Sequence, residues 1–390
     1  MKRSRFSRRA KQSPDADLLV RLATEHSQSS SRLEDEFWET RLAKIVDRLL
    51  AEQDETSITT ALDQLYSTGN RGYDHLIDLV EYCVETRRGE ADGGLDAVLI
   101  AVPLLAWSRF QIPAGPIASP ALAALRVHLQ AHMLAADARL CLADYLFSPD
   151  QLPQSYVETS QIADKLVKAA IHGRDHHIDT TQLADTVHFL SDTRYLMGAV
   201  AIARGAPLFR WQEEDGHRDE AMRQWRTQGS EVLRPLLPAC AMELLPPAAY
   251  HVSIRDADRA SRPYSLQAAM AFLQTVLNKV AGDFRAVIAP YYDHQIEEYR
   301  IGFILKENGE VVHGVVWPLL DGEDENAETA SQIEAILRET GLTDIVVLEH
   351  RLPLEYCDDC GAPLYPNAEG EPIHAELPEE PSESAPRHLH

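Results

Sequence analysis

Two cysteines near the C-terminus have a spacing that suits metal binding. The stretch YCDDCGAPLYP places Cys357 and Cys360 three positions apart, with Gly361 directly after them. In such a turn, the backbone N–H groups that follow the first cysteine can point at its sulfur, and glycine can take the positive φ that the next position needs. The pattern predicts half of a structural zinc site, in the form of a zinc knuckle.

The remaining ligands must come from elsewhere in the sequence, because structural zinc is bound by four side chains. His374 lies fourteen residues after Cys360, and His350 lies seven residues before Cys357. We expect these two histidines to complete an intrachain Cys2His2 site. In a rival arrangement, two chains each give one cysteine pair to a shared ion. The sequence leaves both arrangements open.

Thiol–disulfide chemistry is another interpretation of the same pair. A redox-active cysteine needs a helix N-terminus or a similar feature to lower its pKa. Here Gly361 and Pro363 disfavour a helix, and the carboxylates of Asp358 and Asp359 disfavour a thiolate. Zinc is therefore favoured over redox chemistry and over a pair without a role. We expect the other cysteines to be small core residues of apolar helices: Cys83, Cys141 and Cys240.

Two histidine clusters elsewhere give weaker indications of a metal site. The run HGRDHHID, residues 172–179, contains the Asp-His-His triplet that some metal-dependent phosphoesterases use at the end of a strand. Helices are expected on both sides of it, so a solvated loop is favoured over a hydrolase that uses Asp175. His128 and His132 lack the glutamate of the metalloprotease motif. The sequence shows no nucleophile elbow and no phosphate-binding glycine loop. No catalytic centre is evident, and a non-catalytic protein is favoured.

The charge of the chain limits its partners. A formal net charge of −24 repels phosphate backbones and anionic lipid, so the whole surface cannot be a general binder of nucleic acid or membrane. The N-terminal arm is the exception, because its first eleven residues include no acid. An arm of this kind can contact RNA or a ribosome, or it can be a solubilising tail. Its basic residues are Lys2, Arg3, Arg5, Arg8, Arg9 and Lys11.

The sequence favours a cytoplasmic protein without membrane contact. No apolar run of signal-peptide length follows the basic arm. The longest apolar run, residues 95–107, is about half of a membrane span and contains Asp96 and Pro103. Five cysteines, most of them far apart, agree with a reducing compartment.

The fold class predicted from periodicity is multidomain, with an all-α region followed by an α+β region. We expect residues 1–17 to be a disordered arm and residues 18–246 to be an α-helical domain. In LEDEFWETRLAKIVDRLL, for example, Phe37, Leu42 and Ile45 recur near one helix face. We expect the Pro246–Pro247 pair to mark a domain boundary, because proline interrupts both helix and sheet hydrogen bonding and the periodicity changes there.

After the proline pair, the apolar pattern shifts toward a period of two. Residues 248–350 predict the order β-α-β-β-β-α-β, with two helices on one face of a mainly antiparallel sheet. Asn308–Gly309 between two strands is a strong hairpin signal. Residues 351–376 form the zinc-knuckle-like segment, and 377–390 are an acidic, proline-rich tail that we expect to be disordered. The strands are YHVSI, FRAVIAPYY, EYRIGFILK, VVHGVVWPLL and DIVVLEH, and the helices are SLQAAMAFLQTVLNKV and NAETASQIEAILRETG.

The two ends of the chain carry a resemblance to a known family. MKRSRFSRRAK at the start and EYCDDCGAPLYPNAEGEPIHAELPE at the end resemble the ends of an uncharacterised proteobacterial family, known only as a domain of unknown function. The likeness covers the full length and implies no activity. It also implies that the segment from Cys357 to His374 occurs as a unit.

Three functions follow from these observations, in order of preference. The first is a cytoplasmic interaction or regulatory protein, with the helical region as the surface for a protein partner and zinc in a structural role. The second is a nucleic-acid- or ribosome-associated factor that uses the basic arm and the knuckle. The third is a metal-dependent hydrolase. The sequence leaves the partner, the substrate, the biological process and the oligomeric state open.

Overall fold

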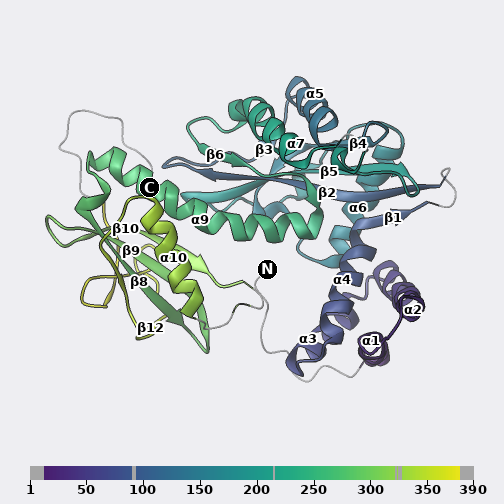
Figure 1. Ribbon diagram of the computed structural model, residues 1–390, viewed down its shortest axis with the longest axis horizontal. Helices are drawn as coiled ribbons and strands as arrows, with labels where there is room; N and C mark the ends of the chain where they lie inside the picture. Colours follow the sequence, from purple (N-terminus) through teal and green to yellow (C-terminus); the bar gives the residue numbers. More distant parts are fainter. Residues whose placement is uncertain (1–12, 90–93, 214–215, 321–322, 324–326, 378–390) are drawn as a thin grey trace. The chain divides into compact units, whose positions relative to one another are not determined.

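The computed structural model describes residues 13–89, 94–213, 216–320, 323 and 327–377. The chain has two compact units, which divide between Ala257 and Asp258, inside one long helix. Figure 1 shows the elements of both units. The basic residues from Lys2 to Lys11 and the acidic tail after Leu377 lie outside the described residues.

Four helices at the start of the first unit share one core, and we call them the helix group. Their apolar faces meet in a cluster that includes Leu42 and Leu65, both fully buried. Phe37, which the periodicity places on the buried face of its helix, is instead 54% exposed. The helices are α1 (Pro14–His26), α2 (Arg32–Ala51), α3 (Glu55–Ser67) and α4 (Gly72–Glu85).

Helix α1 begins inside the segment 1–17, for which the composition predicts disorder. The Ser13 side chain caps the helix by accepting a hydrogen bond from the Ala16 N–H. Pro14 follows at the first helical position, where its fixed φ suits a helix and its missing N–H is not needed. Local capping therefore extends the ordered region beyond the bound that charge alone suggests.

A seven-stranded antiparallel sheet follows the helix group and belongs to the same unit. The strand order is β1-β2-β5-β4-β3, and β6 and β7 also pair with β2. The strands are β1 (Thr86–Arg88), β2 (Leu95–Trp107), β3 (Gly115–Pro116), β4 (Arg139–Phe147), β5 (Ser191–Ala203), β6 (Ala241–Leu244) and β7 (Ala248–Ala249).

This sheet shows that the expected all-α region 18–246 is wrong. β2 and β5 pair along their whole length, from Leu95 opposite Ala203 to Trp107 opposite Ser191. Both strands are buried on both faces over most of their length. A strand buried on both sides has a continuous apolar sequence without the period-two alternation of a half-exposed strand. Such a run cannot be told from a buried helix by periodicity alone.

Pro103 in β2 lies opposite the break at the Pro246–Pro247 pair in the neighbouring edge strand. The carbonyl of Pro103, in the middle of β2, accepts a hydrogen bond of 2.9 Å from the Leu245 N–H. The adjacent edge is divided into β6 and β7, and Pro246 and Pro247 lie between them. The edge strand is thus interrupted where Pro103 has no N–H to donate. Independent folding of residues 248–390 stays a prediction.

Helices pack on both faces of the first sheet. α5, α7 and α8 lie on one face, where Leu125, Trp225 and Leu233 share a core cluster with the inward side chains of β2. The Trp225 Nε1–H donates to the Leu245 carbonyl at 2.9 Å. α6 contacts β2, β4 and β5 as well as α4. The helices are α5 (Ser119–His128), α6 (Tyr156–Ile171), α7 (Arg218–Gln224) and α8 (Ser230–Leu233), with π-helical turns at Leu129–Met133 and Trp225–Gly229.

The predicted strand YHVSI is the start of a helix. α9 (Tyr250–Leu277) is continuous over 28 residues, although it contains Pro263. The Ser253 hydroxyl donates to the Ala101 carbonyl of β2 at 2.8 Å, and the Glu85 carboxylate accepts from the His251 N–H at 3.1 Å. A five-residue apolar run does not distinguish strand from helix. These tertiary contacts fix the helix.

The sheet of the second unit confirms the other predicted elements. β8 (Phe284–Tyr292), β9 (Ile296–Leu305) and β10 (Val311–Pro318) form an antiparallel meander, and β11 (Ile345–Val347) and β12 (Leu352–Pro353) pair with β8 in parallel. The Asn308–Gly309 turn joins β9 to β10, and Gly309 has a φ of +77°. α10 (Ala327–Glu339) connects β10 to β11.

The two faces of this second sheet are covered differently. On one face, the Phe272 ring of α9 lies 5.8 Å from the His313 ring of β10, and Arg262 of α9 stacks on Trp317. On the other face lies a small two-stranded sheet of β13 (Tyr365–Pro366) and β14 (Pro372–Ile373). We call residues 355–376, which include these strands and the cysteine pair, the metal ribbon.

No helix among the described residues is both long enough and apolar enough to cross a membrane.

Candidate metal centre

The cysteine pair forms the tight turn that the sequence predicts. The Gly361 N–H donates to the Cys357 carbonyl at 2.8 Å, and the Cys357 N–H donates to the Ala362 carbonyl at 2.8 Å. Gly361 has a φ of +72°, which confirms the expected role of this glycine. An antiparallel bridge between Tyr356 and Pro363 closes the turn into a short hairpin.

Backbone hydrogen bonds at this turn favour a thiolate at Cys357. The N–H groups of Cys360 and Asp359 point at its sulfur, and the side chain of Cys360 adds a third hydrogen bond. These donors hold the pKa of the Cys357 thiol below its ordinary value, although burial and the Asp359 carboxylate act in the opposite direction. A thiolate is the form of cysteine that binds metals.

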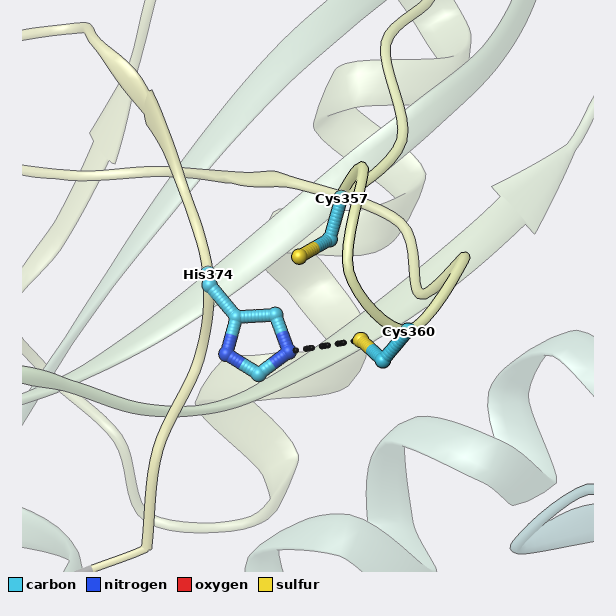
Figure 2. A group of neighbouring side chains, drawn as sticks. All are labelled: Cys357, Cys360 and His374. Atoms are coloured by element: carbon cyan, nitrogen blue, oxygen red, sulfur yellow. Dashed lines mark hydrogen bonds between the residues drawn. The ribbon is translucent and has the colours of Figure 1, made fainter.

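A second hairpin brings His374 to the cysteines. Tyr365 of β13 pairs with Ile373 of β14, and the turn between the strands is closed by the Asn367 side chain, which accepts from the Glu371 N–H at 2.8 Å. His374 directly follows β14 and therefore lies at the end of the hairpin that faces the cysteine turn. Figure 2 shows the imidazole directed toward both sulfur atoms.

The three side chains form a group whose size suits one metal ion. One ligand atom from each of Cys357, Cys360 and His374 lies within 4.8 Å of the other two. The Cys360 Sγ and the His374 Nε2 are 3.3 Å apart. In a tetrahedral zinc site, bond lengths of about 2.0–2.3 Å place the donor atoms about 3.5–3.8 Å from one another. The Cys360–His374 separation is slightly shorter than this range and the other separations are at most 4.8 Å, so small shifts of the three donor atoms would place them around one zinc ion.

The carboxylate of Glu376 lies behind the histidine. Its Oε1 is 3.6 Å from the His374 Nδ1, on the opposite side of the ring from the Cys360 sulfur. Nδ1 thus faces a carboxylate while Nε2 faces the sulfur, which is the orientation that a metal-binding histidine takes when a carboxylate lies beyond its other ring nitrogen. The fit of a zinc ion thus extends beyond the three donor atoms.

His350 is not part of this group. Its side chain is exposed, and its Nε2 lies 3.5 Å from the Gly370 carbonyl. Gly370 belongs to the turn of the β13–β14 hairpin, whereas His374 lies at the opposite end of β14. A Cβ atom on Gly370 would lie 2.8 Å from the His350 ring. The structure therefore brings together three of the four expected ligands.

The other residues considered from the sequence have different surroundings. The Asp175 carboxylate accepts from the Leu142 N–H at 3.0 Å and from Arg126, so it ties its loop to β4. The exposed His177 bonds to Asp144 at 2.6 Å. Cys83 and Cys141 are buried, as predicted, although Cys141 lies in β4 and not in a helix, and Cys240 is only partly buried. Burial raises the pKa of the Cys83 and Cys141 thiols to about 12. In the described part of the chain, the only metal-ligand group with three such members is the one in the ribbon.

Arg300 of β9 holds the base of the cysteine turn on the sheet. This fully buried guanidinium donates from Nη1 to the carbonyls of Glu355 and Leu364, at 2.6 and 2.8 Å, and from Nε to the Glu298 carboxylate at 2.6 Å. It stacks on the Tyr291 ring, with 4.3 Å between the guanidinium carbon and the ring centroid. Glu355 and Leu364 flank the cysteine turn on either side, so Arg300 fixes its position.

Two glycines make room for the ribbon on the same face of the sheet. Gly302 and Gly314 are Cα partners on β9 and β10. A Cβ atom on Gly302 would lie 2.2 Å from the Pro366 carbonyl oxygen, and one on Gly314 would lie 2.2 Å from the Tyr365 ring. Sequence reasoning missed Arg300 and both glycines. The signal was an arginine and two glycines inside strands that are otherwise apolar.

Comparison with known proteins places the chain in a family. A family model described as "Protein of unknown function (DUF2863)" matches residues 4–388. The chain belongs to this family. The resemblance carried by its two ends is thereby confirmed. No curated protein and no solved structure matches the chain. Membership in the family assigns no activity, so the metal centre has to be judged on its own geometry.

Proposed function

We propose that the metal ribbon binds one zinc ion per chain through Cys357, Cys360 and His374, and that the ion has a structural role. The observation that carries the proposal is the convergence of these donors within 4.8 Å from two separate hairpins. Thiolate and imidazole ligands in a compact group suit zinc better than magnesium or calcium, which prefer oxygen. The proposed compartment is the cytoplasm, because free thiol ligands need a reducing environment.

Elemental analysis of untagged protein tests this proposal. The variant should carry His388→Ala and His390→Ala, so that terminal histidines cannot add a surface ion. We expect one zinc per chain. A value of one half would favour an ion shared between two chains, and metal-free protein with both ribbon thiols freely titratable would remove the proposal.

Substitutions can distinguish the metal ligands from neighbouring residues that do not bind the ion. Cys360→Ser and His374→Ala should each release the metal, because a site with two remaining protein donors binds zinc weakly. His350→Ala is the matched control, and we expect it to leave the metal content unchanged. Metal loss in the His350 variant would instead support the four-ligand site that the sequence predicts.

We further propose that the protein is a non-catalytic interaction or regulatory protein whose helix group binds a protein partner. Two large apolar side chains on α2 support this role, because Leu33 is 81% exposed and Phe37 is 54% exposed. Affinity capture from the native cell with the wild-type chain and with a Leu33→Ser/Phe37→Ser variant tests it. A partner that binds both chains equally would place the interaction elsewhere.

The second candidate function is contact with RNA or a ribosome through the basic arm. The six positive charges within residues 1–11 favour it, because the rest of the chain is acidic. Deletion of residues 1–11 should abolish salt-sensitive RNA retention without unfolding the protein. Equal retention by the full-length and truncated chains would remove this candidate.

A further inference from the structure

A pocket of about 470 Å³ lies at one end of the first sheet. Three segments form its walls: the chain just after β2, the end of β4 with the turn that follows it, and residues 180–188 before β5. Pockets that bind small molecules commonly enclose about 300–1,000 Å³, so a small ligand fits here. The polar lining residues include Gln111, Tyr145, Gln151, Thr180, Asp185 and His188.

A buried arginine fixes the wall that follows β2. Arg194 of β5 is fully buried, and its guanidinium donates to the carbonyls of Ile112 and Pro113 at 2.7 and 2.8 Å. The Asp192 carboxylate pairs with the same guanidinium. Gln111, which lines the pocket, directly precedes the two residues whose carbonyls are held in this way. Its backbone is therefore positioned by buried interactions and not by the surface.

A single amide fixes the opposite wall. The Gln151 Oε1 accepts from the N–H of the fully buried Ser148 at 3.1 Å. The Gln151 Nε2 donates to the Tyr145 hydroxyl at 3.2 Å and to the Ala184 carbonyl at 3.1 Å. This side chain thus ties the end of β4 to the segment 180–188. Polar groups that are held by their neighbours in this way are already positioned for a ligand.

Several lining groups keep hydrogen-bonding capacity for a ligand. The Tyr145 oxygen accepts a hydrogen bond, which leaves its O–H as a donor. The Nε2 atoms of Gln111 and His188 are 3.0 Å apart, which leaves the Gln111 carbonyl oxygen and the second ring nitrogen of His188. The Asp185 carboxylate and the Thr180 hydroxyl have no side-chain partner among the described residues. Donors and acceptors are therefore mixed around one space.

The charge of the lining decides which class of ligand is suitable. No lysine or arginine is among the described residues that line the pocket, and Asp185 carries a negative charge there. A phosphate or carboxylate ligand would therefore be repelled. An apolar ligand would leave the polar lining groups unpaired, which is costly. Hydroxyl groups each donate and accept, so they suit a lining of mixed donors and acceptors.

Two exposed aromatic rings lie beside the pocket in the chain. Phe110 is 48% exposed and Phe189 is 60% exposed, and each is next in sequence to a lining residue. The Ser108 N–H donates to the Leu190 carbonyl at 2.8 Å, so the two segments that carry these rings run side by side. Exposed apolar groups at the edge of a polar pocket are typical of a ligand-binding surface. Aromatic rings offer flat apolar faces to the C–H groups of a ligand.

We propose that this pocket binds a neutral saccharide. The sugar hydroxyls pair with the Tyr145, Asp185 and Gln111 side chains, and the C–H face of the ring packs against the neighbouring aromatic surface. The inference goes beyond the proposed zinc site, because the pocket belongs to the first unit and the metal ribbon to the second.

Saturation-transfer NMR on the full-length chain provides the test. The probes are ribose, glucose, galactose, mannose, N-acetylglucosamine and maltose, each titrated separately. We expect at least one of these neutral sugars to bind saturably at concentrations up to about 10 mM. The phosphate ester of the same sugar should bind more weakly, because the Asp185 carboxylate repels it. Glucosamine, which is cationic, should not bind more tightly than glucose.

Substitutions at exposed positions locate the binding site. Gln111→Ala and Asp185→Ala each remove a hydrogen-bonding group from the lining and should weaken binding at least about tenfold. Gln182→Ala is the matched control, because Gln182 is an exposed amide of the same segment and is not among the lining residues. We expect the control to bind the sugar as the wild type does.

Three outcomes would overturn the proposal. If none of the neutral sugars binds, the pocket is not a saccharide site. If Gln111→Ala and Asp185→Ala bind the sugar as tightly as the wild type, the ligand lies elsewhere on the chain. Tighter binding of the phosphate ester or of glucosamine would assign the pocket to a charged ligand instead.

Discussion

The helix group of the first unit and the metal ribbon of the second unit bury very different kinds of surface. The helix group packs Leu42, Leu65 and many other apolar side chains into one continuous core. The ribbon contributes only partly buried apolar groups, among them Tyr365 and Ile373, to the cluster over its sheet. Its position depends on the hydrogen bonds of Arg300 and on a close fit over two glycines.

This difference bears on how each region can fail. The stability of an apolar core is distributed over many contacts. Each truncation removes only part of the buried apolar area and therefore lowers the unfolding free energy by a limited amount. A ribbon held by one buried arginine can be released by a single substitution. We therefore expect metal binding to be more sensitive to changes beneath the ribbon than to any change in the helix group.

The largest effect is expected for Arg300→Leu. This change leaves the Glu298 carboxylate and the Glu355 and Leu364 carbonyls without their donor, and the loss of one partner of a buried pair costs about 3–5 kcal/mol. Hydrogen exchange of the full-length chain should show faster exchange in β9 and the ribbon, and the proposed zinc ion should dissociate more readily.

Arg285→Leu is the matched control for that substitution. Arg285 pairs with Asp344 at 3.0 Å, but its side chain is 40% exposed. Surface ion pairs contribute about 0–1 kcal/mol, so we expect little change in either measurement. Equal effects of Arg300→Leu and Arg285→Leu on hydrogen exchange and zinc dissociation would mean that the burial of Arg300 does not make its interactions stronger than those of Arg285.

A core truncation in the helix group tests whether this region affects stability without affecting metal binding. Leu65→Ala removes a fully buried side chain and should lower the unfolding free energy of the helix group by about 2–5 kcal/mol. Metal content should remain unchanged. Leu33→Ala, at an 81% exposed position of α2, is the control and should change stability by less than about 0.5 kcal/mol. Zinc loss in the Leu65 variant would show that the helix group and the metal ribbon are coupled, which contradicts their expected independence.

Acid should weaken the second sheet before the helix group. Burial lowers the pKa of His313 to about 4, from an ordinary value of 6.5. The folded state favours the neutral ring. The contribution of His313 to the free energy of unfolding is therefore complete above pH 6.5, and it is lost as the pH falls toward 4. The loss is on the order of 3 kcal/mol, at 1.36 kcal/mol for each pKa unit.

Urea denaturation at pH 7.5 and pH 4.5, with His313→Gln as the comparison, measures this effect. The variant should lose less stability than the wild type between the two pH values. His26 in the helix group also has a lowered pKa, because of burial and His75, but Glu39 and Asp35 act against the shift. A helix group that unfolds first in acid would reverse the expected order.

The smallest effect is expected for a single methyl group beneath the ribbon. Gly314→Ala places a Cβ atom 2.2 Å from the Tyr365 ring, and such overpacking costs about 1–3 kcal/mol. Limited proteolysis should cleave the ribbon faster. Gly282→Ala, where a Cβ atom meets nothing within 4 Å, is the control and should cleave at the wild-type rate.

Local preferences along the chain were enough to predict the features that depend on neighbouring residues. The CxxCG turn, the positive φ of Gly361, the Asn308–Gly309 hairpin and the strands β8 to β10 all follow from local preferences and from a period of two. The family resemblance likewise came from the two ends of the chain. His374 was found because its ligand chemistry and its spacing from Cys360 were visible without a fold.

Other features depend on which surfaces meet, and these appear only in the folded chain. β2 and β5 became strands, and Tyr250 began a helix, because an apolar run takes the conformation that its neighbours can cover. His350 was separated from His374 by the length of a hairpin, which spacing along the chain does not reveal. Arg300, Gly302 and Gly314 act through residues about fifty or more positions away, so their roles exist only once the ribbon lies on the sheet.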